Sequence, residues 1–203
     1  FRSHRSIPGL GGAFTTRSVS GGGVLIDWGV HFIDLILHCV GDPAPKTVSG
    51  QAYSKLGRKM RDYAYVDMWA GPPKLDGTYD VEDFITGLIR TDGPTITLNG
   101  AWAQNIGVEE MYVDFLGDKA GIRLQYLGNF KLYTAKNGSL LEITPSFSSK
   151  PPFQNEIDSF LDCIRTGEKL PSHIDRVVVT QKIIQALYDS SEQKKEISFP
   201  EGD

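Results

Sequence analysis

Two ionisable residues spaced four apart, Asp27 and His31, are the clearest candidates for chemistry in this sequence. On a helix predicted from Gly22 to Val40, they share one narrow stripe with Asp34 and His38. A carboxylate one turn before an imidazole can accept its ring N–H, fix its tautomer and raise its basicity. The spacing therefore favours proton transfer at His31 with Asp27 in support, whereas Asp34 and His38 are explained as well by core or surface positions.

The predicted helix starts directly after Ser20-Gly21-Gly22-Gly23. The first turn of a helix carries free N–H groups and the positive end of the helix dipole, both of which favour anions. We therefore expect a small polyhydroxylated or anionic ligand beside this turn. A metal site using His31 with His38 or Asp27 is an alternative, although the two-turn spacing, the lack of a His-Glu-x-x-His motif and the lack of a nearby Cys disfavour it.

The composition excludes several classes of protein. The 203 residues carry a net charge of −4, which gives no basic surface for nucleic acid. With 40% hydrophobic and 23% charged residues, the chain is typical of a globular protein. The apolar stretch Val24 to Val40 contains four polar or charged residues, so no membrane span is expected. Only two cysteines, Cys39 and Cys163, are present, and a cytoplasmic location fits them.

The elements that must position the pair follow from the periodicity. A strand is predicted at Thr47 to Ser54, and an irregular connection covers residues 55–80. From Val81 onward, apolar and polar residues alternate between Gly-, Asn- and Asp-rich turns, which predicts an antiparallel meander. Helices are expected at Asn155 to Thr166 and Ile174 to Glu192, and a last strand at Glu196 to Phe199.

This order predicts one α+β domain over residues 1–203, with a large, mostly antiparallel open sheet and helices packed on one face. The other face mixes polar and apolar side chains, and we expect a subunit contact there. The residues on which that expectation rests are Thr86, Arg90, Thr97, Asn99, Tyr112 and Asp114.

The run from Ser20 to Leu35 closely resembles the Gly-Gly-Gly, Asp-x-Gly-x-His-x-x-Asp motif of the glucose-fructose oxidoreductase/inositol dehydrogenase (Gfo/Idh/MocA) family. Other stretches resemble the C-terminal domain of that family. They are Arg5 to Gly9 with Phe14 to Thr16, Asp80 to Phe84 leading to Ala101 to Asn105, Asn155 to Phe160 continuing through Arg165 to Gly167, and Ala186 to Ser190 with Glu196 and Ile197.

The resemblance implies a C-terminal substrate-binding and oligomerising domain, of the dihydrodipicolinate-reductase-like type, in a protein whose N-terminal Rossmann domain binds NAD or NADP. That Rossmann domain is not expected in this chain, because no Gly-x-Gly-x-x-Gly follows a strand. The Lys of the family's Glu-Lys-Pro motif would lie in the same missing domain. By motif, Asp27 and His31 match the catalytic Asp and His, and Asp34 matches a second, structural acid.

The expected function is therefore the substrate-binding and catalytic half of an NAD(P)-dependent oxidoreductase of a sugar, cyclitol or related polyol. Thr16, Arg17, Trp102 and Asn105 are further candidates for binding the substrate. The fragment alone is expected to bind no cofactor or metal and to be inactive. A homodimer or homotetramer is expected through the sheet face. The alternative function is a non-catalytic homo-oligomerisation module.

Overall fold

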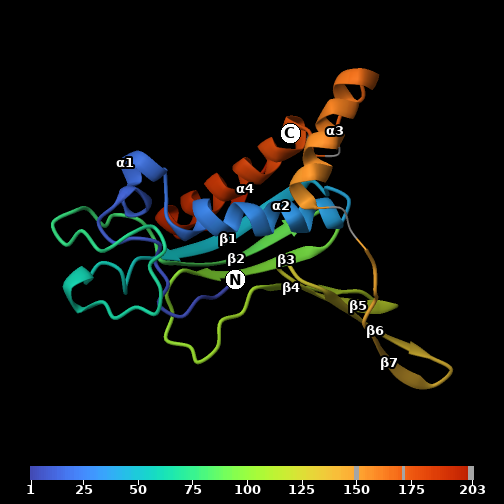
Figure 1. Ribbon diagram of the computed structural model, residues 1–203, viewed down its shortest axis with the longest axis horizontal. Helices are drawn as coiled ribbons and strands as arrows, with labels where there is room; N and C mark the ends of the chain where they lie inside the picture. Colours follow the sequence, from blue (N-terminus) through green and yellow to red (C-terminus); the bar gives the residue numbers. More distant parts are fainter. Residues whose placement is uncertain (149–150, 171, 201–203) are drawn as a thin grey trace. The chain divides into compact units, whose positions relative to one another are not determined.

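The structure, a computed structural model, describes residues 1–148, 151–170 and 172–200 (Figure 1). The chain forms two compact units. The first comprises Phe1–Glu110 and the chain from Val178 onward, and the second comprises Met111–Val177. Antiparallel strands and a few helices make up these units, so the predicted α+β class is confirmed.

The predicted single sheet is divided into two four-stranded sheets. The first unit holds strands in the order β3-β2-β1-β8, and the second holds β4-β5-β6-β7. The division falls between β3 and β4, where residues 102–111 form no named strand. The strands are β1 (Pro45–Tyr53), β2 (Phe84–Thr91), β3 (Thr95–Ala101), β4 (Tyr112–Leu116), β5 (Ala120–Gln125), β6 (Phe130–Lys136), β7 (Ser139–Ile143) and β8 (Ile197–Ser198).

Small residues on one face of the first sheet let a helix approach its backbone. Gly50 of β1 pairs with Gly87 of β2, and Leu187 of α4 (Ile174–Gln193) lies over both. A Cβ at either glycine would come within 2.7 Å of the Leu187 Cδ2 atom. This face, with α2 (Val30–Cys39) and α4 lying across it, contains the core of the unit (Figure 1).

Helix α4 also completes the edge of β1. Beyond the short pairing with β8, the backbone N–H groups of Gly50 and Ala52 donate to the hydroxyls of Ser190 and Ser191, each at 2.9 Å. Two adjacent serines on one helix thus satisfy strand donors that would otherwise lack a partner. This bonding fixes α4 along the strand.

The helix predicted from Gly22 to Val40 has an unexpected start. A π-helical turn occupies Leu25–Gly29, and regular α2 begins only at Val30. The predicted stop is confirmed, since Gly41 has φ +84° and the Asp42 N–H donates to the Leu37 carbonyl. Single π turns inside helices are frequent at functional sites because they change which residues face a given direction.

The run Arg17–Cys39 is long and apolar enough to pass for a membrane-spanning helix by length and composition, as the core helix of a soluble protein also does. In the structure it is divided into α1 (Arg17–Ser20), the π turn and α2, and 44% of its most apolar window is buried inside the protein. It therefore gives only weak support for a membrane span. At its end Cys39 is an exposed free cysteine.

Two irregular segments lie against each other. The N-terminal lead includes a short turn at Ala13–Thr15, and residues 54–80 include another at Met60–Asp62. Backbone N–H groups of Val66, Ala70 and Lys74 donate to carbonyls of the lead at 2.7–3.0 Å. The long connection expected at residues 55–80 therefore supports the lead along its length.

The second unit is a regular meander whose two faces differ. Asn137 and Gly138 both have positive φ and close the β6–β7 hairpin, which confirms the predicted turn. One face carries apolar side chains, and the other carries the Asp114–Arg123 and Lys131–Glu142 ion pairs. Helix α3 (Pro152–Thr166) buries none of its residues, so its apolar stripe is exposed instead of packed.

Candidate functional site

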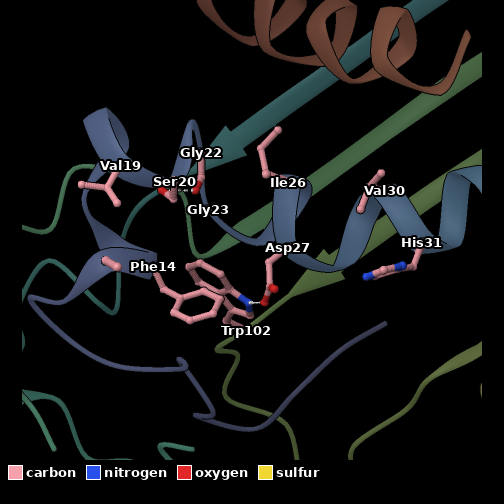
Figure 2. A pocket seen from close by; sticks show the side chains of 11 residues that line it. Phe14, Val19, Ser20, Gly22, Gly23, Ile26, Asp27, Val30, His31 and Trp102 are labelled. Carbon is pink, nitrogen blue, oxygen red and sulfur yellow. Dashed lines mark hydrogen bonds between the residues drawn. The ribbon is translucent and has the colours of Figure 1, made fainter. Parts of the chain in front are cut away.

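The start of the long helix, the lead and the end of β3 together line a cavity of about 390 Å³ in the first unit (Figure 2). Its wall is mostly apolar, with Asp27 and His31 as its ionisable groups. The lining residues are Ala13, Phe14, Val19, Ser20, Gly22, Gly23, Ile26, Asp27, Val30, His31 and Trp102. The sequence-predicted pair thus lies on a common concave surface.

The Asp27 carboxylate is held by an aromatic donor from the sheet. Trp102, which follows β3 and is 1% exposed, donates its indole N–H to Asp27 Oδ2 at 2.8 Å. Burial raises the pKa of Asp27, while the Trp102 hydrogen bond and the charge of His31 act in the opposite direction. The effect of burial is the largest of the three, so the pKa of Asp27 lies above its ordinary value.

His31 is exposed along the cavity wall and not bonded to Asp27 (Figure 2). Within the described parts of the chain, no hydrogen bond joins the imidazole to the carboxylate, in contrast to the arrangement expected for residues one turn apart. The π turn that contains Asp27 accounts for this, because its larger number of residues per turn changes the angle between side chains four residues apart. The interaction between the two side chains in this structure is electrostatic, with the charge of His31 lowering the pKa of Asp27.

The four residues predicted to bind substrate have different positions. Only Trp102 lines the cavity. Thr16 donates its hydroxyl to the Gly12 carbonyl at 2.9 Å, and the Asn105 amide oxygen accepts from the Arg5 guanidinium. The Arg17 guanidinium lies 5.5 Å from the centre of the Tyr188 ring. These three side chains therefore bind elsewhere in the protein and do not line the cavity.

Sequence reasoning did not identify Glu82, which organises the helix start. This residue is 4% exposed, and its carboxylate accepts the backbone N–H groups of Gly23 and Leu25, each at 3.0 Å. Tyr188 donates its hydroxyl to the same carboxylate at 2.8 Å. The backbone also passes very close, because a Cβ on Gly23 would lie 2.0 Å from the Glu82 carbonyl oxygen.

The expectation that the free N–H groups of the helix start bind an anionic ligand is wrong for the two N–H groups that Glu82 accepts. The N–H groups of Gly23 and Leu25, which were expected to be free for an anionic ligand, already donate to a protein carboxylate. A second anion at this turn would meet the charge of Glu82 as well as that of Asp27. The glycine-rich turn is therefore a structural contact that places Asp27, and two of its N–H groups are already occupied.

Two acids next to Glu82 in the sequence also accept backbone N–H groups from other segments. Asp80 accepts the Arg17 N–H at 2.6 Å, and Asp83, 1% exposed, accepts three successive N–H groups at residues 55–57. Burial raises the pKa of Asp83, and these backbone hydrogen bonds oppose that rise. Three acids in four positions directly before a buried strand were the sequence signal for this role.

The remaining acid and histidine of the polar stripe, Asp34 and His38, have a structural and a surface position. Thr180 of α4 donates to Asp34 at 3.2 Å, which links the two helices. His38 is exposed at the end of α2. No cluster of three or more His, Cys, Asp and Glu suited to a metal occurs among the described residues, so the metal alternative gains no support.

Comparison with known proteins gives the class. The family described as "Oxidoreductase family, C-terminal alpha/beta domain" (Gfo/Idh/MocA) matches residues 15–199. The chain belongs to this family. The resemblance found in the Asp27 and His31 motif is thereby confirmed.

Several similar proteins have names that specify a substrate or a bound ligand. D-glucoside 3-dehydrogenase of Escherichia coli (strain K12) is 29% identical over 189 residues, which cover 92% of this chain and 51% of that protein. The structure of aldose-aldose oxidoreductase from Caulobacter crescentus, complexed with glycerol, matches with a TM-score of 0.71 and 18% identity over 93% of this chain and 51% of that one. Levoglucosan dehydrogenase, complexed with NADH and levoglucosan, matches with a TM-score of 0.72 and 14% identity, covering 95% and 54%. The chain spans about half the length of these proteins.

Proposed function

We propose that this chain forms the substrate-binding and catalytic half of an NAD(P)-dependent oxidoreductase that acts on a sugar or sugar glycoside. The observation that carries this proposal is the common cavity wall on which Asp27 and His31 lie, with Trp102 behind them. The relatives named for D-glucoside and levoglucosan support the choice of a sugar substrate. The non-catalytic alternative leaves this polar pair in an otherwise apolar cavity without a role.

The nicotinamide would supply hydride transfer when bound, and we propose that another domain holds it. This proposal is supported by the glycine-rich helix start at Gly21 to Gly23, where the N–H groups of Gly23 and Leu25 already donate to Glu82 and are not available for a pyrophosphate. In oxidation, the hydroxyl proton of the substrate passes to the His31 ring as the carbinol carbon loses hydride and becomes a carbonyl. The Asp27 charge stabilises the resulting imidazolium.

We propose that the substrate is uncharged. Asp27 and Glu82 place two carboxylates around the helix start, and no Lys or Arg is among the cavity-lining residues. A substrate carboxylate in the cavity would be repelled by this arrangement, and nothing among those residues would compensate it. The apolar wall instead suits the C–H surface of a neutral sugar ring.

The experiment is an activity assay on the complete protein that contains this chain. NAD⁺ and NADP⁺ would each be supplied with methyl D-glucoside or with the methyl glycoside of D-glucuronic acid, which differ at C6, where a carboxylate replaces the neutral hydroxymethyl group. Reduction of a cofactor with the glucoside, at a kcat/KM at least about tenfold above the glucuronide, is expected. Absence of turnover with every sugar tested would contradict the enzymatic function, and a preference for the glucuronide would contradict the neutral substrate.

We also propose self-association through the outer face of the first sheet. Its side chains are polar and half-exposed around Leu88, and Glu196 accepts from Thr47 and Arg90 across the strands. Light scattering on the complete protein should give a dimer or tetramer, burying more than about 1,000 Å² per contact. Leu88→Arg should yield monomers, whereas Leu127→Arg, at a 93% exposed turn position of the second unit, should not. A wild-type monomer at micromolar concentration would contradict the proposal.

A further inference from the structure

An exposed tryptophan lies next to the cavity without lining it. Trp69, in the connection before β2, is 58% exposed. Its ring meets that of Phe14 edge-on, with centroids 4.9 Å apart and planes at 75°. Phe14 is itself part of the cavity wall beside Trp102 (Figure 2). The aromatic surface of the cavity therefore continues outward from Phe14 to Trp69.

We propose that Phe14 and Trp69 form an outer subsite, which binds the aglycone of a glycoside whose sugar ring occupies the cavity. This inference rests on the proposed sugar oxidoreductase function and specifies the substrate further, as a glycoside with an aryl or other apolar aglycone. Continuity of the surface is the argument for that occupant. Phe14 lines the cavity that also contains Asp27 and His31, and its ring contacts Trp69. A sugar ring in the cavity and a group against Trp69 can therefore belong to one molecule.

The backbone around Trp69 is firmly placed. Ala70, the next residue, donates its N–H to the Pro8 carbonyl at 2.7 Å, and Lys74 donates to Leu10 at 2.8 Å. Farther along, Gly11 and Gly77 pass so closely that a Cβ on either would come within about 2 Å of a carbonyl oxygen of the opposite segment. Trp69 is thus presented by a segment tied to the same lead that carries Phe14.

The exposure of Trp69 makes it suitable for binding. An indole is large and apolar, and burying it would stabilise the fold. Because more than half of Trp69 is exposed to water, the fold does not gain much of that stabilisation. A flat apolar aglycone would bury that surface without needing a charged partner. A charged aglycone would find no opposite charge on Phe14 or Trp69, because both side chains are uncharged.

The test compares phenyl D-glucoside with methyl D-glucoside as substrates of the complete protein. The wild type should favour the phenyl compound, and Trp69→Ala should lower kcat/KM for it about tenfold, mainly through KM. Turnover of methyl D-glucoside should change less than about twofold. Trp69→Phe, which keeps an aromatic ring, should retain most of the preference.

Tyr65→Ala is the matched control. Tyr65 lies in the same connection and is 50% exposed, but its ring stacks on Tyr63 and does not line the cavity. It should leave both substrates unchanged. Equal losses on the two substrates in Trp69→Ala, no loss on phenyl D-glucoside, or an equal effect of Tyr65→Ala would overturn the subsite.

The two proposals fail in different ways. Turnover of methyl D-glucoside without any preference for the phenyl compound would preserve the enzymatic function and overturn the subsite. If neither compound is turned over, the enzymatic function fails, and calorimetric titration with phenyl D-glucoside still decides the subsite. Binding that weakens about tenfold in Trp69→Ala would support it, and binding that is absent or unchanged would overturn it.

Discussion

The indole N–H of Trp102 donates to Oδ2 of Asp27 at 2.8 Å, joining the end of β3 to the first turn of the long helix. This bond favours the ionised form of Asp27 against the opposing effect of burial. It therefore links a residue that is wholly buried in the first unit to the charge state of the proposed site.

Trp102→Phe should shift the acid limb of the pH–rate profile. The substitution removes a hydrogen bond that lowers the pKa of Asp27, while burial continues to raise it. The pKa of Asp27 should therefore rise, and the carboxylate should become protonated at higher pH. Because the proposed mechanism needs ionised Asp27, activity should fall off at a higher pH than in the wild type. The measurement is kcat/KM against pH for a neutral sugar, and an unchanged or acid-shifted limb would show that Asp27 ionisation does not control the rate.

Glu82→Ala should destabilise the first unit. The change leaves the N–H groups of Gly23 and Leu25 and the Tyr188 hydroxyl without their acceptor in a buried place. We expect the free energy of unfolding to fall by about 3 kcal/mol, measured by urea denaturation.

Tyr188→Phe serves as the comparison for Glu82, because it removes one of these hydrogen bonds and keeps the carboxylate. Its cost should be smaller, about 1.5 kcal/mol. A Glu82 variant as stable as the wild type would mean that the glycine turn does not need its carboxylate.

Gly23→Ala should impair both folding and catalysis. The added Cβ would lie 2.0 Å from the Glu82 carbonyl oxygen, so the turn must move and carry Asp27 with it. Overpacking of this kind costs about 1–3 kcal/mol. Gly107→Ala is the control, since a Cβ there meets nothing within 4 Å. Thermal unfolding and turnover should be altered in the first variant only, and equal behaviour of the two would contradict the close approach.

Local patterns were sufficient to predict much of this fold. Alternation and turn residues located the strands, and Asn137-Gly138 identified its hairpin because two positive φ angles are needed there. The helix stop at Gly41 followed from the same kind of local constraint. The split into two sheets depends on long-range pairing and is not encoded in a local pattern.

The candidate site was predictable only in part. The types and spacing of Asp27 and His31 identified the pair. The orientation of the two side chains depends on the π turn at Leu25–Gly29, and no hydrophobic periodicity in the sequence predicts such a turn. Glu82 was missed because a buried acid is recognisable only once the N–H groups around it are known. Thr16, Arg17 and Asn105 lie near the motifs along the chain, yet each binds a neighbour away from the cavity.

The most direct test of the account is the turnover of His31→Ala beside His38→Ala in the complete protein, with a neutral sugar and a saturating nicotinamide cofactor. Both histidines are exposed and two turns apart on the same helix, but only His31 lines the cavity. We expect His31→Ala to lower kcat by about 10²- to 10⁴-fold while cofactor binding is retained, and His38→Ala to leave kcat within about twofold of the wild type. Unchanged turnover in His31→Ala, or equal losses in the two variants, would contradict the assignment of His31 as the proton acceptor.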